Sequence, residues 1–196
     1  MKLTVITQPP VEPITKAQVY EWLRLDTTGS PPAHANDATF DMLIEAAREA
    51  VENDTRRSLI QQTIEIQCGR FPVALLRPPF ISVTQVRYYD STNVEQSLSP
   101  SVYQVRQSTT PILGLQDGQS WPDIYYRQDA VTVRYVTGYE GTGSPVDDYR
   151  ANVPRGLQQA CLLHVQLAYD NLKSVDHDIL QKAYDRLIER FRIPLV

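Results

Sequence analysis

The sequence has few of the residues on which most catalytic and membrane-inserted proteins depend. Only 3 of its 196 residues are histidine and 2 are cysteine. No apolar run approaches the roughly 20 residues that span a bilayer, and the apolar stretch near Met1 is too short for a signal peptide. Cys68 and Cys161 each fall on a predicted apolar face, so we expect free thiols rather than a disulfide. A cytoplasmic protein is therefore expected.

Long basic runs are also missing. The formal net charge is −4, and no run of Lys or Arg exceeds two residues. Phosphate contacts supply most of the non-specific affinity for a DNA duplex, so a protein that grips DNA should be more basic. We therefore interpret Arg56-Arg57 as a solvated helix end rather than a phosphate clamp. DNA can still pass near such a protein without being held.

The usual catalytic motifs are incomplete. Residues 118–122 begin like a nucleophile elbow but have Pro122 where the second Gly belongs. Residues 141–144 lack the third Gly and the Lys of a phosphate-binding loop. The sequence has no His-Glu-x-x-His and no Cys-x-x-Cys. These departures argue against the commonest hydrolases, nucleotide-binding enzymes and zinc proteins.

The remaining polar candidates for chemistry are scattered along the chain. We expect His34 to be solvated in a loop and His164 to be a core histidine of a helix. Three histidines on unrelated elements do not form the pattern of a catalytic triad. Acids next to each other in loops are usually solvated or cap helices, and we expect no metal, cofactor or catalytic site here. The acidic and histidine candidates for a metal are Asp147, Asp148, Asp176, His177 and Asp178.

Two helices are predicted near the N-terminus, after an extended, Pro-rich segment over residues 1–14. Thr15 and Gln18 have the spacing of a capping box for a helix over residues 16–25. A second helix is predicted from Asn36 or Asp37 to about Arg57, because apolar residues recur at a helical period. The faces expected to be buried are Val19, Trp22 and Leu23 in the first helix, and Phe40, Leu43, Ile44, Ala47, Ala50 and Val51 in the second.

Two more helices are predicted near the C-terminus. One starts at Pro154 and runs to about Lys173, and its second apolar stripe, Leu163 and Leu167, suggests contact with a neighbouring subunit. Another begins at Asp176 or Asp178 and is stopped by Pro194. We expect its inner face to be Ile179, Leu180, Ala183, Tyr184, Leu187, Ile188 and Phe191, with an apolar tip over Ile193–Val196 beyond it.

The middle of the chain has the alternation of β-strands. Residues 60–68 alternate apolar and polar side chains, as in a half-buried antiparallel strand. In residues 77–90 the apolar parity changes, which predicts a bulge or short turn near Thr84-Gln85. Residues 114–121 are expected to be irregular, and residues 130–136 to form the last strand. About six short strands in this region indicate a meander or small sandwich.

These patterns predict an α+β fold. Its expected core has four helices, two N-terminal and two C-terminal, with an inserted antiparallel β meander or small sandwich. The expected parts are residues 1–58 (helical), 59–137 (antiparallel β), 138–152 (a loop) and 153–196 (the C-terminal helices and tail). Residues 15–58 and 153–196 are expected to pack together as one helical core.

Six stretches in order resemble one known protein family over nearly the whole chain. They are residues 9–19 (PPVEPITKAQV), 50–60 (AVENDTRRSLI), 77–90 (RPPFISVTQVRYYD), 118–122 (GQSWP), 131–139 (VTVRYVTGY) and 153–160 (VPRGLQQA). They are similar to the head–tail connector, or adaptor, proteins of tailed phages, prophages and gene transfer agents. None of them is a chemical signature.

The resemblance implies a structural virion protein of the neck, without cofactor or catalytic residues, that is assembled in the host cytoplasm. Members form a dodecameric ring beneath the portal, continue the channel through which double-stranded DNA passes, and carry the stopper or tail-completion protein. Their C-terminal region reaches the portal. On this resemblance, the residues expected to dock on the portal are Arg190, Arg192, Ile193, Leu195 and Val196.

Three alternatives remain open at this point. The first is that the chain is another neck component, such as a stopper or tail-completion protein, which would share ring symmetry but bind the adaptor. A different class is a small enzyme that uses Asp147/Asp148 or Asp176/His177, which would require a deep polar pocket. The third is a monomeric binding module built on the β region. A frayed end is the alternative interpretation of the C-terminal tip.

Overall fold

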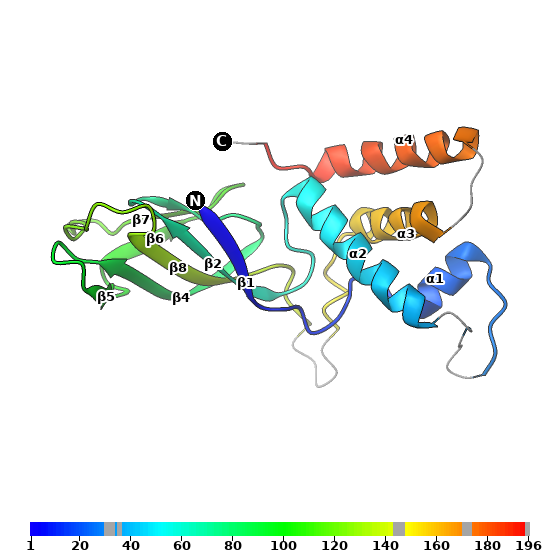
Figure 1. Cartoon of the computed structure of the whole chain (residues 1–196), viewed down its shortest axis with the longest axis horizontal. Helices are drawn as coiled ribbons and strands as arrows, with labels where there is room; N and C mark the ends of the chain where they lie inside the picture. The colour runs from blue at the N-terminus through cyan, green and yellow to red at the C-terminus, as the bar shows by residue number, and fades with distance from the viewer. Residues whose placement is uncertain (30–33, 35–36, 143–147, 170–173, 195–196) are drawn as a thin grey trace. The chain divides into compact units, whose positions relative to one another are not determined.

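The chain forms two units, each with its own hydrophobic core. The computed structural model describes residues 1–29, 34, 37–142, 148–169 and 174–194. Met1–Pro10 and Gln61–Gly138 make one unit, which we call the β unit. Val11–Ile60 and Tyr139–Val196 make the other, the helical unit (Figure 1). None of the helices in the described residues has the length and apolar character needed to cross a membrane.

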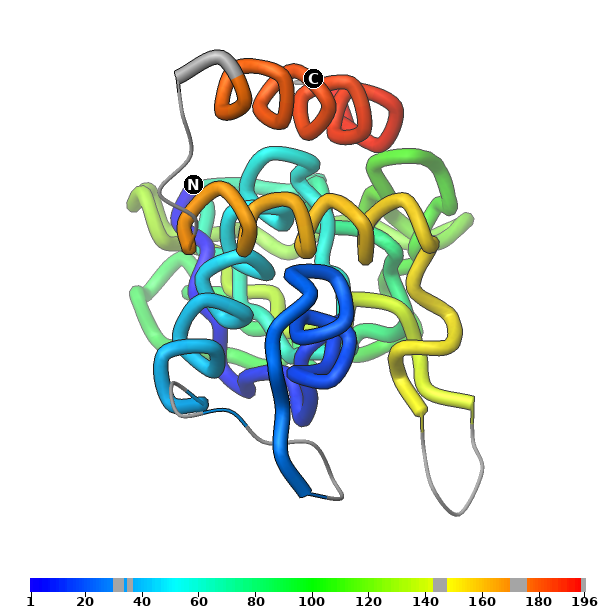
Figure 2. The backbone as a smooth tube through the Cα atoms, turned by 90° about the vertical axis from the view of Figure 1, so that its right-hand side faces the viewer, coloured from blue at the N-terminus to red at the C-terminus, as the bar shows by residue number. Residues whose placement is uncertain are grey.

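Four helices build the helical unit. They are α1 (Lys16–Leu23), α2 (Asp37–Thr55), α3 (Arg155–Tyr169) and α4 (Ser174–Phe191). α2 and α3 each contact the other three helices, and α3 lies between α4 and α1 in Figure 2. The predicted apolar stripes of α2 and α3 meet in the core, because each places its large residues on one side of the helix. Among the buried residues are Phe40, Ile44, Ala47, Val51, Leu157, Cys161 and Val165.

α1 begins as predicted but buries less of its face than expected. Gln18 N–H donates to Thr15 Oγ1 at 3.2 Å, and Thr15 N–H donates to Gln18 Oε1 at 2.8 Å, which is the capping box. The helix ends at Leu23, before Arg24 at a φ of 55°. The expectation that Trp22 is buried is wrong. Its side chain is 38% exposed and its indole N–H donates to Gln166 at 2.9 Å.

α4 starts earlier than predicted, and only some of the apolar residues predicted for its inner face are buried. It begins at Ser174, before both of the predicted caps, Asp176 and Asp178. Tyr184 and Ile188 are buried as expected. Ile179 is 60% exposed, so its assignment to the inner face is wrong. Helical spacing alone places Ile179 within the apolar arc, and only the position of α3 decides which part of that arc is covered.

The β unit has eight strands in two antiparallel sheets. The strands are β1 (Lys2–Thr7), β2 (Gln62–Cys68), β3 (Val73–Ala74), β4 (Phe80–Tyr89), β5 (Glu95–Ser97), β6 (Tyr103–Arg106), β7 (Ile112–Leu115) and β8 (Val131–Thr137). One sheet has the order β1-β2-β8-β4-β5 and the other the order β3-β7-β6. β8 lies at the centre of the larger sheet, and five of its seven residues are buried. Both sheets contribute to one core, as in a small sandwich.

β4 contains the predicted irregularity. Its pairing with β8 shifts register between Val83 and Gln85, with a further shift between Phe80 and Ser82. An extra residue in one strand turns the following side chains to the other face. Val86 is therefore buried although Val83 is half-buried and of opposite parity. The predicted bulge near Thr84-Gln85 is confirmed.

Two strands were not foreseen. β1 pairs with β2, so residues 1–10 belong to the β unit rather than to the helical part with which the sequence grouped them. β7 lies at residues 112–115, partly within the stretch expected to be irregular, and pairs with both β3 and β6. Both are short and carry weak alternation. β1 also pairs with a strand that is distant in the sequence, whereas β7 follows its partner β6 closely. The α+β class with four helices and antiparallel sheets is confirmed.

Candidate functional site

The end of α4, where the sequence placed the docking residues, is hydrogen-bonded to the end of α2. Arg57 Nε donates to the carbonyl oxygen of Phe191 at 2.8 Å. Arg56 Nη1 donates to the carbonyl oxygen of Ile193 at 2.5 Å. The last carbonyls of a helix have no partner within it, and two guanidinium groups supply partners here.

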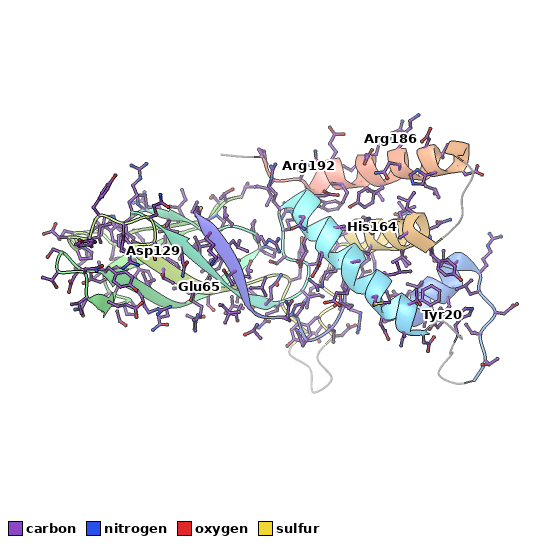
Figure 3. The ribbon with its side chains drawn as sticks, in the orientation of Figure 1. Tyr20, Glu65, Asp129, His164, Arg186 and Arg192 are labelled. Atoms are coloured by element: carbon purple, nitrogen blue, oxygen red, sulfur yellow. The ribbon has the colours of Figure 1, made fainter. Side chains whose placement is uncertain are left out.

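The same segment returns donors to α2. The backbone N–H of Ile193 donates to the Thr55 carbonyl oxygen at 3.1 Å. Arg192 Nε donates to the Asp54 carbonyl oxygen, also at 3.1 Å, and Figure 3 labels Arg192 at the end of α4. The end of α2 therefore donates hydrogen bonds to carbonyl oxygens at the end of α4, and the end of α4 donates to carbonyl oxygens of α2. We name this set, residues 54–57 and 191–193, the C-terminal clasp.

Arg56 occupies a backbone position that usually belongs to glycine. Its φ is 57°, and the Arg57 N–H donates back to the Glu52 carbonyl oxygen at 3.2 Å, which is one bond of a Schellman ending. A glycine would adopt this conformation more easily but would lose the guanidinium bond to Ile193. The interpretation of Arg56-Arg57 as solvated is therefore wrong, because both side chains are half-buried and bind α4.

The clasp changes the status of the predicted docking residues. Ile193 was expected to project without an intramolecular partner, but its side chain is only 5% exposed. Arg190 and Arg192 are exposed, and Arg192 already holds α2 through Nε. Leu195 and Val196 lie outside the described residues. Ile193 thus anchors the end of the chain to α2. The docking roles of Arg190, Arg192, Leu195 and Val196 stay predictions.

Side chains under the clasp hold α4 against the rest of the helical unit. Tyr184 Oη donates to Asp54 Oδ2 at 2.7 Å, and burial together with that carboxylate raises the pKa of the phenol. A Cβ added at Gly156 would lie 2.9 Å from the Phe191 ring, so glycine permits this close approach. His164 lies beside the Tyr184 ring, with centroids 5.7 Å apart. Burial lowers the pKa of His164, and the charge of Asp54 opposes this effect in part.

The second apolar stripe of α3 is covered within its own chain. Leu163 is 4% exposed and belongs to the helical core. Leu167 is half-buried and packs against that core. Leu163 is therefore shielded from water within the helical unit, and the subunit interface predicted at Leu163 and Leu167 stays a prediction.

The candidates for metal or proton chemistry do not converge. Among the residues that the structure describes, no three His, Cys, Asp or Glu side chains are placed to hold a metal ion. Asp176, His177 and Asp178 are all exposed at the start of α4. Asp148 accepts the Arg150 N–H at 3.0 Å, as in an ordinary turn, and Asp147 lies outside the described residues.

The two cysteines and His34 have local explanations. Cys68 and Cys161 are free thiols as predicted, and burial raises the pKa of both. His34 was expected to be solvated but lies half-buried between aromatic rings. Its centroid is 6.1 Å from that of Tyr20 and 5.6 Å from that of Phe40.

A buried ionic cluster was missed from the sequence. Arg48, 3% exposed, donates from Nε to Glu12 at 2.9 Å and lies 3.5 Å from Glu52, which is 1% exposed. Glu52 also accepts the Leu59 N–H at 2.8 Å. Burial raises the pKa of Glu12 against the lowering effect of Arg48. The spacing of Arg48 and Glu52 was visible, but it resembles an ordinary surface pair one helical turn apart.

Comparison with known proteins shows the fold. No family model matches the chain, and no curated protein matches it. A chain from the neck of an empty gene transfer agent (GTA) particle, computed with C6 symmetry, matches with a TM-score of 0.74 at 21% identity. A chain from the virion of a native GTA particle matches at 0.70, and one from a native neck computed with C12 symmetry at 0.67, both at 22% identity. Each comparison covers 100% of this chain and 97% of the other, so the whole chain shares the fold of a GTA neck protein.

Proposed function

We propose that the protein is a structural head–tail connector, or adaptor, of a phage-like particle. It forms a ring under the portal, continues the DNA channel and carries the stopper or tail-completion protein. The observation that supports this most strongly is the likeness to chains of GTA necks, because it extends over 100% of this chain and 97% of the other. Fold alone does not imply function, so the proposal also uses the chemistry of the chain.

The charge of the chain suits a channel wall. Its formal net charge is −4, so double-stranded DNA would slide past without strong phosphate contacts or sequence-specific binding. The scattered polar candidates suit a structural role too, since Asp176, His177 and Asp178 are solvated at a helix start. We infer a virion protein of the neck, assembled in the host cytoplasm, with no enzymatic activity and no membrane attachment.

Imaging tests the proposal directly. The purified protein is mixed with the portal protein of the same particle, and the complex is examined by electron microscopy. A ring of this chain bound coaxially to the portal, with twelvefold symmetry, is the expected result. A protein that stays monomeric with portal present contradicts the proposed function. Hydrolysis of common ester, phosphate or peptide substrates by the purified protein contradicts the non-enzymatic assignment.

The C-terminal segment is the proposed portal-docking element. Because the clasp anchors Ile193, the residues proposed to contact the portal are Arg190, Arg192, Leu195 and Val196. Deleting residues 195–196 should abolish portal binding while leaving the melting temperature unchanged, since the clasp stays intact. An Ile193→Asp variant is the matched contrast, because it should lower the melting temperature as well. Unchanged portal binding after the deletion contradicts docking by this tip.

The contact between subunits is proposed to include α3. Leu167 retains partial exposure, whereas Leu163 supports that surface from inside the core. Leu167→Asp should leave a folded subunit that no longer assembles into rings. Met42→Asp is the control, because Met42 is 65% exposed on α2 and the same charge there should be tolerated. Normal rings from the Leu167 variant contradict this assignment.

A stopper or tail-completion role is the second candidate. It shares ring symmetry, and the likeness to neck chains supports it as well. The two roles differ in the first partner that binds. An adaptor binds the isolated portal, whereas a stopper binds only after another ring has been added. Binding assays with the portal alone therefore separate them.

A further inference from the structure

A loop of the β unit is held rigidly at several points. We call residues 121–129 the tyrosine loop. The Trp121 ring stacks on Phe71 with centroids 4.2 Å apart and planes at 1°. The Tyr125 N–H donates to the Tyr89 carbonyl oxygen at 2.9 Å, and Ile124 forms a bridge with Asp90. These contacts tie the loop to the neighbouring turns and fix its path.

Arg127 adds a second set of restraints. Its guanidinium donates to both carboxylate oxygens of Asp129, at 2.6 and 2.8 Å. It also lies 3.9 Å above the centre of the Tyr89 ring and donates to Asn93. The bidentate pair raises the pKa of Arg127 and lowers that of Asp129. The Arg127 charge is therefore neutralised inside the loop.

The rigid loop presents two tyrosines to solvent. Tyr126 is fully exposed, at 102%, and Tyr125 is 43% exposed. Leaving an aromatic ring in water gains nothing for folding, because the ring buries no area. Tyrosine on a pre-ordered loop loses little conformational entropy when it binds, and tyrosine and arginine dominate binding hot spots.

A hollow of about 510 Å³ lies beside Tyr126. Its lining is Gly69, Arg70, Tyr126, Arg127 and Gln128, and this lining contains no carboxylate. Within the described part of the chain, the exposed Arg70 guanidinium makes no ion pair or side-chain hydrogen bond, whereas Arg127 is matched by Asp129. The hollow therefore has one uncompensated positive charge next to an exposed aromatic ring.

We propose that the tyrosine loop docks another protein of the particle, through a segment that places a carboxylate on Arg70 and an apolar side chain against Tyr126. Charge complementarity selects a carboxylate, which a guanidinium binds in a bidentate manner. The surface is polar with aromatic anchors, as in contacts formed after folding rather than in obligate subunit interfaces. This inference rests on the proposed function, because it assumes a particle with other proteins.

Nucleic acid and a second copy fit the same surface less well. Binding to a phosphate backbone uses several basic residues, and this hollow has one uncompensated guanidinium in a chain of net charge −4. Contacts between identical ring subunits are large and strongly apolar. The hollow has a single aromatic ring flanked by polar groups.

Photo-crosslinking in assembled particles tests the inference. Tyr126 is replaced by p-benzoylphenylalanine, particles are purified and irradiated, and the attached peptide is identified by mass spectrometry. The control carries the same residue at Met42, which is 65% exposed in the helical unit. We expect position 126 to attach to one peptide of a different protein, containing Asp or Glu, and position 42 not to attach to that peptide.

Charge variants at Arg70 give the second measurement. Arg70→Glu should reduce that crosslink at least about tenfold, as loss of a hot-spot contact does, whereas Arg70→Lys should retain most of it. Attachment to another copy of this chain, attachment to DNA, or a yield unaffected by Arg70→Glu overturns the inference. Particles that contain the protein but yield no crosslink at position 126 overturn it while leaving the proposed function standing. Particles that lack the protein overturn both.

Discussion

The two units each bury a glutamate, but they differ in how far the arginine partners of that glutamate are exposed. In the helical unit, Arg48 and Glu52 are almost fully buried, at 3% and 1% exposure of their side chains. In the β unit, Glu65 also accepts hydrogen bonds from two arginines, Arg87 at 3.3 Å and Arg134 at 2.9 Å. Those arginine side chains are 26% and 34% exposed, so water still reaches them.

This difference determines what remains when a partner is removed. Loss of Arg48 would take away the guanidinium that lies 3.5 Å from the buried Glu52 carboxylate. Loss of Glu65 would leave two arginines that can turn towards solvent. A buried unpaired charge is costly, whereas an exposed ion pair contributes little. The helical unit should therefore depend on its ionic cluster far more than the β unit depends on its own.

Each unit has one tryptophan, so the comparison can be measured unit by unit. Trp22 lies in the helical unit and Trp121 in the β unit, and the chain has no others. A Trp121→Phe background leaves fluorescence from the helical unit alone. A Trp22→Phe background reports the β unit alone. Urea unfolding of each variant in both backgrounds then assigns its effect to a unit.

The largest expected effect is that of Arg48→Ala. Leaving Glu52 and Glu12 without their guanidinium should lower the free energy of unfolding of the helical unit by about 3–5 kcal/mol. Urea unfolding followed by Trp22 fluorescence measures it. The β unit, followed by Trp121, should keep its midpoint. A loss below about 1 kcal/mol would show that the buried cluster is not a main support of the unit.

A smaller effect is expected for Glu65→Gln in the β unit. The amide keeps the shape and part of the hydrogen bonding, and the arginines left behind are half-exposed. We expect a loss of about 1–2 kcal/mol, near that of one charge-assisted hydrogen bond. The measurement is the urea midpoint of Trp121 fluorescence. A loss equal to that of Arg48→Ala would remove the distinction between the units.

One carboxylate in each unit should respond to acid with opposite sign. Hydrogen bonds from the Thr92 hydroxyl, the Gln96 amide and the Val94 N–H lower the pKa of Asp90 to about 2 from 3.8. The unfolded state binds more protons in that range, so the β unit loses the contribution of Asp90 as the pH falls from about 3.8 to about 2. Asp90→Asn should flatten this loss in melting curves followed by Trp121.

The raised pKa of Glu12 should give the opposite change of stability with pH in the helical unit. Burial raises its pKa above 4.5, so the folded state binds more protons just above that pH. Its contribution to the stability of the helical unit therefore rises as the pH falls through the folded pKa towards 4.5. Glu12→Gln should remove this rise in melting curves followed by Trp22. The same slope in both units would contradict the assignment.

The smallest expected effect is that of Ile179→Ala. The side chain is 60% exposed, so its truncation should change the free energy of unfolding of the helical unit by less than about 0.5 kcal/mol. Ile188→Ala on the same helix is the matched control, since Ile188 is 1% exposed and should cost about 2–5 kcal/mol. Equal losses would restore the prediction that Ile179 faces the core.

The helices of the helical unit were largely predictable, because their starts and apolar faces depend on residues close together in the sequence. The capping box of Thr15 and Gln18 and the apolar stripe of α2 depend on residues three or four apart. The bulge in β4 was predictable for the same reason, since parity is a local property. β1 was missed because its partner β2 is distant in the sequence, and β7 was missed because its four residues carry little polar–apolar alternation.

The sequence by itself determined the helices, the alternating strands and the absence of known catalytic motifs, because each is a property of neighbouring residues. Only the tertiary structure decided which polar groups are buried. Arg48 looks like a surface residue of α2, and Ile193 looks like a free apolar tip. The first is enclosed by Glu12 from a distant segment, and the second is held by Arg56 across 137 positions of sequence. Burial depends on which segments meet in space, and spacing along one element does not contain that information.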